Sequence, residues 1–80
     1  MLKCFQVEFF RGIEGLGPFA YVAAFEANDA MVLAKAQRIL SGHRDTAVEC
    51  VREVMSKELL ARIGSLGHLP HILDIEAVTE

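Results

Sequence analysis

The side chains best suited to chemistry are histidines, and two of them stand close together in the segment His68-Leu69-Pro70-His71. Imidazole is a common zinc ligand, but a zinc site needs three or four ligands that converge on one point. His43 and Asp45 lie elsewhere in the sequence, and the pair at 68 and 71 lacks the helical spacing of a metal-binding H-E-x-x-H motif. The sequence therefore predicts solvated loop histidines and neither a metal site nor a cofactor.

Three glycines, at positions 12, 15 and 17, precede Pro18. They do not match the G-x-G-x-x-G pattern that cradles phosphates, and no helix is expected directly behind them. The segment 12–18 is therefore predicted to be a hairpin loop, and its glycines predict the most mobile part of the chain.

Nucleophilic catalysis finds little support in the sequence. Ser65 stands in Gly64-Ser65-Leu66-Gly67, where one glycine is adjacent to the serine, whereas a nucleophile elbow needs glycines two positions to either side. Cys4 lies in a predicted strand, where a cysteine usually packs in the core. No catalytic residue is predicted. The alternative is a small dimeric, ferredoxin-like enzyme with an interface pocket lined by Tyr21, His68 or His71, which rests on analogy of fold alone.

The elements that position these residues begin with a hairpin. Residues 2–11 alternate with period two, which places Phe5, Val7 and Phe9 on the core face of a strand. Residues 19–27 alternate in the same way, with Phe19, Tyr21, Ala23 and Phe25 on one side. Two such strands around a glycine-rich connection predict a β-hairpin.

A helix is predicted to follow, with Asn28 as its N-cap, an end near Ser41 and Gly42 as the first residue beyond it. A helical wheel groups the larger apolar side chains on one arc, which is expected to face the sheet. This arc contains Val32, Leu33, Ala36, Ile39 and Leu40. The outer arc would then contain Ala30, Met31, Ala34, Lys35, Gln37, Arg38 and Ser41.

Residues 46–63 do not keep one apolar face, which argues against a single helix. A break at Ser56, acting as an N-cap, gives a short helix over 57–63 closed by Gly64. The β-branched content of 46–55 favours a strand there, although a separate helix remains the alternative. HILDIEAV, residues 71–78, predicts a last strand with Leu73, Ile75 and Ala77 on one face.

The resulting order ββαβαβ predicts one α+β domain over residues 1–80. It is a two-layer sandwich with helices on one face of a mostly antiparallel sheet. Half of the 80 residues are apolar (52%), which is more than a small core needs and favours a homodimer. Two cysteines without a paired spacing favour free thiols and a cytoplasmic location. No apolar run reaches the roughly 18 residues of a membrane span.

The charges suggest where a partner would bind. The whole net charge of −3 comes from residues 41–80, which hold seven acidic and four basic side chains. Glu8, Asp74 and Glu76 are expected on an open sheet face that suits a basic partner. Met31, Ala34, Lys35 and Arg38 on the first helix are expected to form a second contact surface. The acidic balance argues against a nucleic-acid binder, and only Lys35, Arg38 and Arg44 favour it.

The favoured function is a non-enzymatic protein-binding or regulatory protein that acts through an exposed surface. In size, acidity and hairpin-plus-helix pattern the chain resembles small phage or bacterial accessory proteins, some of which inhibit larger host complexes. The resemblance involves no specific motif.

Overall fold

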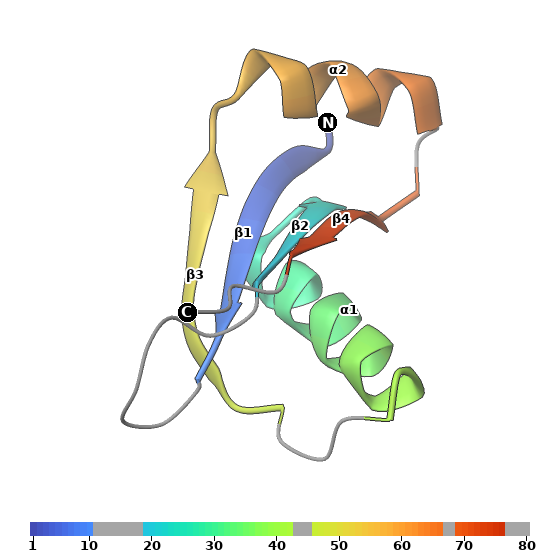
Figure 1. The fold of residues 1–80 in the computed structure, drawn as a ribbon. Helices are drawn as coiled ribbons and strands as arrows, with labels where there is room; N and C mark the ends of the chain where they lie inside the picture. Colours follow the sequence, from blue (N-terminus) through green and yellow to red (C-terminus); the bar gives the residue numbers. More distant parts are fainter. Residues whose placement is uncertain (11–18, 43–45, 67–68, 77–80) are drawn as a thin grey trace.

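A computed structural model describes residues 1–10, 19–42, 46–66 and 69–76, with the backbone alone at 65–66 and 74–76. The predicted loop 12–18, together with His43, Arg44, Asp45, His68 and Ala77, lies outside the described residues. The element order is ββαβαβ, as predicted, in an α+β architecture (Figure 1). The elements are β1 (Lys3–Phe9), β2 (Phe19–Ala24), α1 (Ala27–Leu40), β3 (Val48–Val54), α2 (Lys57–Leu66) and β4 (His71–Glu76).

The four strands form one antiparallel sheet in the order β3-β1-β2-β4. The hairpin of β1 and β2 supplies both central strands, which explains why their residues are the most apolar. The prediction of a strand rather than a helix around 46–55 is confirmed by β3. Each edge strand carries one irregularity, between Glu8 and Phe9 in the pairing with β3 and between Tyr21 and Val22 in the pairing with β4.

The main core lies between α1 and one face of the sheet. As predicted, Phe5, Val7 and Phe9 are buried there, at 0–5% exposure. The helix contributes Ala30 and Ala34, which are 0% and 2% exposed. Partly buried side chains complete this cluster: Leu33, Val48, Val51 and Ile72.

The predicted orientation of α1 is therefore wrong in most positions. Of the arc expected to face the sheet, only Leu33 packs against the core. Val32, Ile39 and Leu40 are 59%, 60% and 82% exposed, and Ala36 is exposed as well. Phe5 and Phe9 already fill the space above the sheet, so the helix approaches with its alanines. Its larger apolar side chains are left outside.

The ends of α1 follow the prediction in part. Gly42 has φ +91°, the left-handed conformation expected of a residue just beyond a helix. The N-cap is Glu26, two residues before the predicted Asn28, and its side chain makes no capping hydrogen bond. Extended backbone at Glu26, with φ −138° and ψ 157°, allows the helix to start directly after β2.

The second helix, α2, packs against a separate cluster of buried side chains. Ile63 of α2 is buried together with Leu2, Cys4 and Ala23, with Leu59 and Leu60 partly buried beside them. Cys4 and Ala23 alternate along their strands with the residues under α1, so they point to the opposite face. Figure 1 shows α2 crossing the end of the sheet where β1 begins. The expected packing of both helices on one face is therefore wrong, because α1 covers one face and α2 covers one end of the other.

Ser56 caps α2 as predicted. The backbone N–H of Leu59 donates to the Ser56 hydroxyl oxygen at 3.4 Å, the geometry of an N-cap bonded to the third helical residue. The helix continues to Leu66 and so passes through Gly64, where the sequence predicted its end. Gly64 is exposed and has no heavy atom near the position of a Cβ, so nothing in the packing requires a break there.

Candidate protein-binding surface

The face of the sheet opposite α1 is covered only at the end where α2 packs, as far as the described residues extend. The rest of this face, called the open face below, follows from the strand register. Gln6 lies opposite Tyr21 on one side and Arg52 on the other, and Glu8 lies between Phe19 and Cys50 in the same way. The open face thus consists of Gln6, Glu8, Phe19, Tyr21, Cys50 and Arg52.

Two aromatic side chains lie on the open face. The Phe19 and Tyr21 rings pack edge to face, with centroids 5.4 Å apart and planes at 81°. Both residues are half-buried, and Tyr21 also contacts the cluster beneath α2. An aromatic pair fixed in this way offers apolar area at little further entropic cost, which is the usual character of a binding hot spot.

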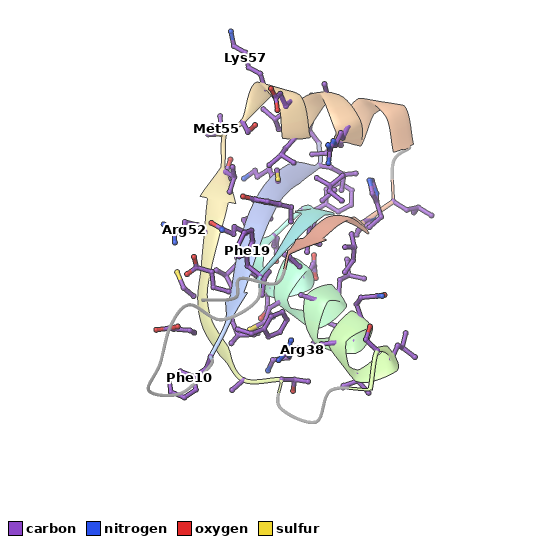
Figure 2. All side chains as sticks on the ribbon, viewed as in Figure 1. Phe10, Phe19, Arg38, Arg52, Met55 and Lys57 are labelled. Carbon is purple, nitrogen blue, oxygen red and sulfur yellow. The ribbon has the colours of Figure 1, made fainter. Side chains whose placement is uncertain are left out.

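An ion pair borders the aromatic pair. The Arg52 guanidinium donates a hydrogen bond from Nη2 to Glu8 Oε1 at 2.7 Å, between β3 and β1. This bond and the negative charge of Glu8 raise the pKa of Arg52 further above its usual range. Arg52 remains 58% exposed, and Figure 2 shows it beside β3. A partner can therefore reach both charges.

The acidic positions predicted for the open face converge around Phe19. Glu8 is its register partner on β1, and Glu76 is its register partner on β4, while Asp74 is paired with Tyr21. Neighbouring strands are about 4.8 Å apart, so these backbone positions flank the aromatic pair closely. A role for Glu8, Asp74 and Glu76 in binding stays a prediction.

The structure contradicts the contact surface predicted on α1 at one of its residues. Ala34 is buried beneath the helix and cannot contact a partner, and Met31 and Lys35 are half-buried. The Arg38 guanidinium lies 4.7 Å from the centroid of the Phe9 ring, where it covers the edge of the core. Figure 2 shows Arg38 between α1 and the sheet. A structural cation–π contact thus accounts for Arg38.

His71 uses one ring nitrogen within its own segment. Nδ1 lies 2.6 Å from the backbone carbonyl oxygen of Leu69, and since a carbonyl only accepts, Nδ1 carries the proton. Nε2 is buried and has no hydrogen-bond partner among the described residues. Of the residues named for the alternative enzyme pocket, His68 lies outside the described residues, and that alternative stays a prediction.

The cysteines and the metal ligands add no further site among the described residues. Cys4 and Cys50 are free thiols, and burial raises the pKa of Cys4. Cys50 is paired with Glu8, four residues along β1 from Cys4. This separation is roughly 13 Å, too long for a disulfide. No group of three or more His, Cys, Asp or Glu side chains is placed to hold a metal ion in the ranges that the structure covers.

Sequence reasoning missed part of the open face. Phe19 and Arg52 were not among the predicted site residues, and Tyr21 was considered only for an enzyme pocket. Their proximity to Glu8 follows from the register in which three strands pair. Alternation within a single strand does not predict that register. A signal was available in β2, where Phe19 and Tyr21 alternate with Ala20 and Val22.

Comparison with known proteins does not assign the chain to a family. No protein-family model matches it, and neither a curated protein nor a solved structure matches it significantly. Within the described residues, neither helix has the length and hydropathy required to cross a membrane.

Proposed function

We propose that this chain is a non-enzymatic protein-binding protein, and that it docks a basic surface of another protein on its open face. The observation that carries this proposal is the Phe19–Tyr21 pair, which is half-exposed and lies beside the carboxylate of Glu8. Aromatic side chains supply most of the binding energy in many interfaces, and charges around them steer the encounter.

The charge of the partner follows from the distribution of carboxylates. Glu8 is 29% exposed and pairs with Arg52, while the register of β4 sets the positions of Asp74 and Glu76 opposite Tyr21 and Phe19. The chain carries a net charge of −3. A basic partner would pair with these groups and stack apolar or guanidinium groups on the aromatic pair. The two free thiols support a reducing compartment such as the cytoplasm.

The test compares three versions of the intact chain as bait in a native lysate, next to the wild type. Phe19→Ala removes half of the aromatic pair, and Glu8→Gln removes the carboxylate charge with little change in shape. Lys57→Glu alters a charge at the exposed start of α2 and serves as the control. Quantitative mass spectrometry should find a basic protein with the wild type and Lys57→Glu, and at least fivefold less of it with the other two variants.

The captured protein is then purified and titrated against the same variants at two salt concentrations. Binding should weaken as salt rises, because the exposed charges are screened. Equal capture by all variants with unchanged thermal unfolding would contradict the proposal, since neither the aromatic pair nor the carboxylate would then matter.

A homodimer remains a separate prediction. The observation that favours it is the outer side of α1, where Val32, Ile39 and Leu40 are exposed. Met31 is half-buried at the border of this side. If two copies meet here, Ile39→Glu and Met31→Glu should lower the molar mass in solution to that of one chain. A wild type that already sediments as a monomer at about 100 μM would contradict the dimer.

A further inference from the structure

The outer edge of β3 presents backbone groups that another strand could pair with. In the order β3-β1-β2-β4 this strand is terminal, and only β1 pairs with it among the described residues. Its irregularity at Glu49 leaves a regular stretch from Cys50 to Val54. Along such an edge every second residue directs its N–H and C=O groups away from the sheet. Met55, which follows β3, is 74% exposed.

The charges along this edge oppose pairing with a second copy. A pairing centred on Arg52 sets two arginines opposite each other, and one centred on Glu53 sets two glutamates opposite each other. Like charges directly opposite destabilise a strand pair. Glu49 and Glu53 are both exposed, so a neighbouring strand would meet them directly.

The same acidic side chains favour pairing with a strand that carries basic side chains. Glu53 and Val51 point to the same face, because they pair with Phe5 and Val7. An incoming strand with Lys or Arg opposite Glu53 and an apolar residue opposite Val51 would match both positions. The negative net charge, which arises entirely from residues 41–80, attracts such a segment over longer distances.

We propose that the edge of β3 receives an extended basic segment of a partner protein as a fifth strand of the sheet. This goes beyond docking on the open face, because affinity here comes from backbone hydrogen bonds along one strand and selectivity comes from Glu53. The segment needs about five residues in extended conformation to cover Cys50–Val54.

The test uses synthetic peptides and the intact wild-type chain. The probe is a capped nine-residue peptide in which Lys, Thr, Val and Thr repeat in this order, so that Lys and Val stand two residues apart and share one face of the strand. One control carries Glu in place of Lys, and a second keeps every Lys but has N-methyl groups on alternate backbone amides, which blocks strand pairing. Fluorescence anisotropy should show at least tenfold tighter binding for the probe than for either control, and hydrogen exchange should slow at amides of 50–54.

Two matched variants test the charge at this edge. Glu53→Gln should weaken probe binding about threefold, the size expected for one cross-strand charge pair. Glu58→Gln, which removes an exposed carboxylate from α2, should leave probe binding unchanged. If the N-methylated peptide bound as tightly as the unmodified probe, the proposal would be overturned, because charge attraction alone would then explain the binding. Protection from hydrogen exchange that appears elsewhere in the sheet, or weakening by Glu58→Gln as large as that by Glu53→Gln, would overturn it as well.

Discussion

The two helices contact the sheet through opposite kinds of side chain. α1 packs through Ala30 and Ala34 and leaves Val32 and Ile39 exposed, whereas α2 buries Ile63. Hydrophobicity alone would have exposed the alanines of α1 instead. The difference shows that the space left by the sheet, and not only the apolar character of the helix, decides which helical side faces inward.

The two faces of the sheet supply the reason. Under α1 the sheet carries large side chains, Phe5 and Phe9, so small helical residues complete the layer. Under α2 it carries Cys4 and Ala23, which leave room for a larger residue such as Ile63. Large and small side chains are thus paired across each layer, as close packing requires. Substitutions that exchange these roles test the comparison.

The largest effect is expected at the α2 contact. Ile63→Ala removes a side chain that is 8% exposed and leaves a cavity beside Cys4 and Ala23. We expect a loss of about 2–4 kcal/mol in the free energy of unfolding. Urea denaturation followed by circular dichroism measures it, with Lys57→Ala on the exposed side of α2 as the control. A loss below about 1 kcal/mol would mean that α2 is not packed as described.

The next effect concerns excess volume beneath α1. Ala34→Leu adds three carbon atoms where the helix approaches the sheet, at a residue 2% exposed. Overpacking of this kind should lower the free energy of unfolding by about 1–3 kcal/mol. Ala36→Leu is the matched control, because it adds the same volume to an exposed position of the same helix. If both substitutions had the same effect, the orientation of α1 would be wrong.

These cases show what could be predicted from the sequence. Alternation placed Phe5 and Val7 correctly, because period two in a strand is fixed by backbone geometry. The wheel failed for α1 because it ranks side chains by hydrophobicity and contains no information on the sheet beneath. The break before α2 was predicted correctly from the change of apolar face along 46–63, and Ser56, a local capping signal that requires no tertiary contact, located it.

The candidate surface was predicted less completely than the fold. The position of Glu8 on the face away from Phe5 follows from alternation alone. The proximity of Phe19 and Arg52 to it depends on pairing between strands that are far apart in the sequence. In the same way, the irregularity between Tyr21 and Val22 changes which side of β4 each later residue occupies, and no pattern within β4 reveals it.

The starts of the two helices give a third prediction. Ser56→Ala removes the hydroxyl that accepts from the Leu59 N–H and should cost about 1 kcal/mol. Glu26 occupies the same position of α1 without a capping hydrogen bond, so Glu26→Ser should increase stability by about 0.5 kcal/mol. Thermal unfolding of both variants checks this. A stabilising Ser56→Ala would contradict the capping role.

The smallest predicted effect uses two glycines that differ in backbone conformation and not in packing. Neither has a heavy atom within 4 Å of the position of a Cβ, so steric contacts cancel from the comparison. Gly42 has φ +91°, which an alanine adopts with strain, and Gly42→Ala should cost about 1 kcal/mol. Gly64 lies within α2, where alanine is the better helix former, and Gly64→Ala should add about 0.5–1 kcal/mol of stability.

Opposite signs are the expected outcome of this last prediction, measured by urea denaturation of both variants under identical conditions. The sign of the stability change caused by Gly64→Ala also tests where α2 ends. If the helix stopped at residue 63, as its sequence suggested, Gly64 would be the residue beyond its end and an alanine there would destabilise the chain. A gain in stability supports a helix that continues to Leu66, because alanine adopts helical backbone without strain and also lowers the conformational entropy of the unfolded chain.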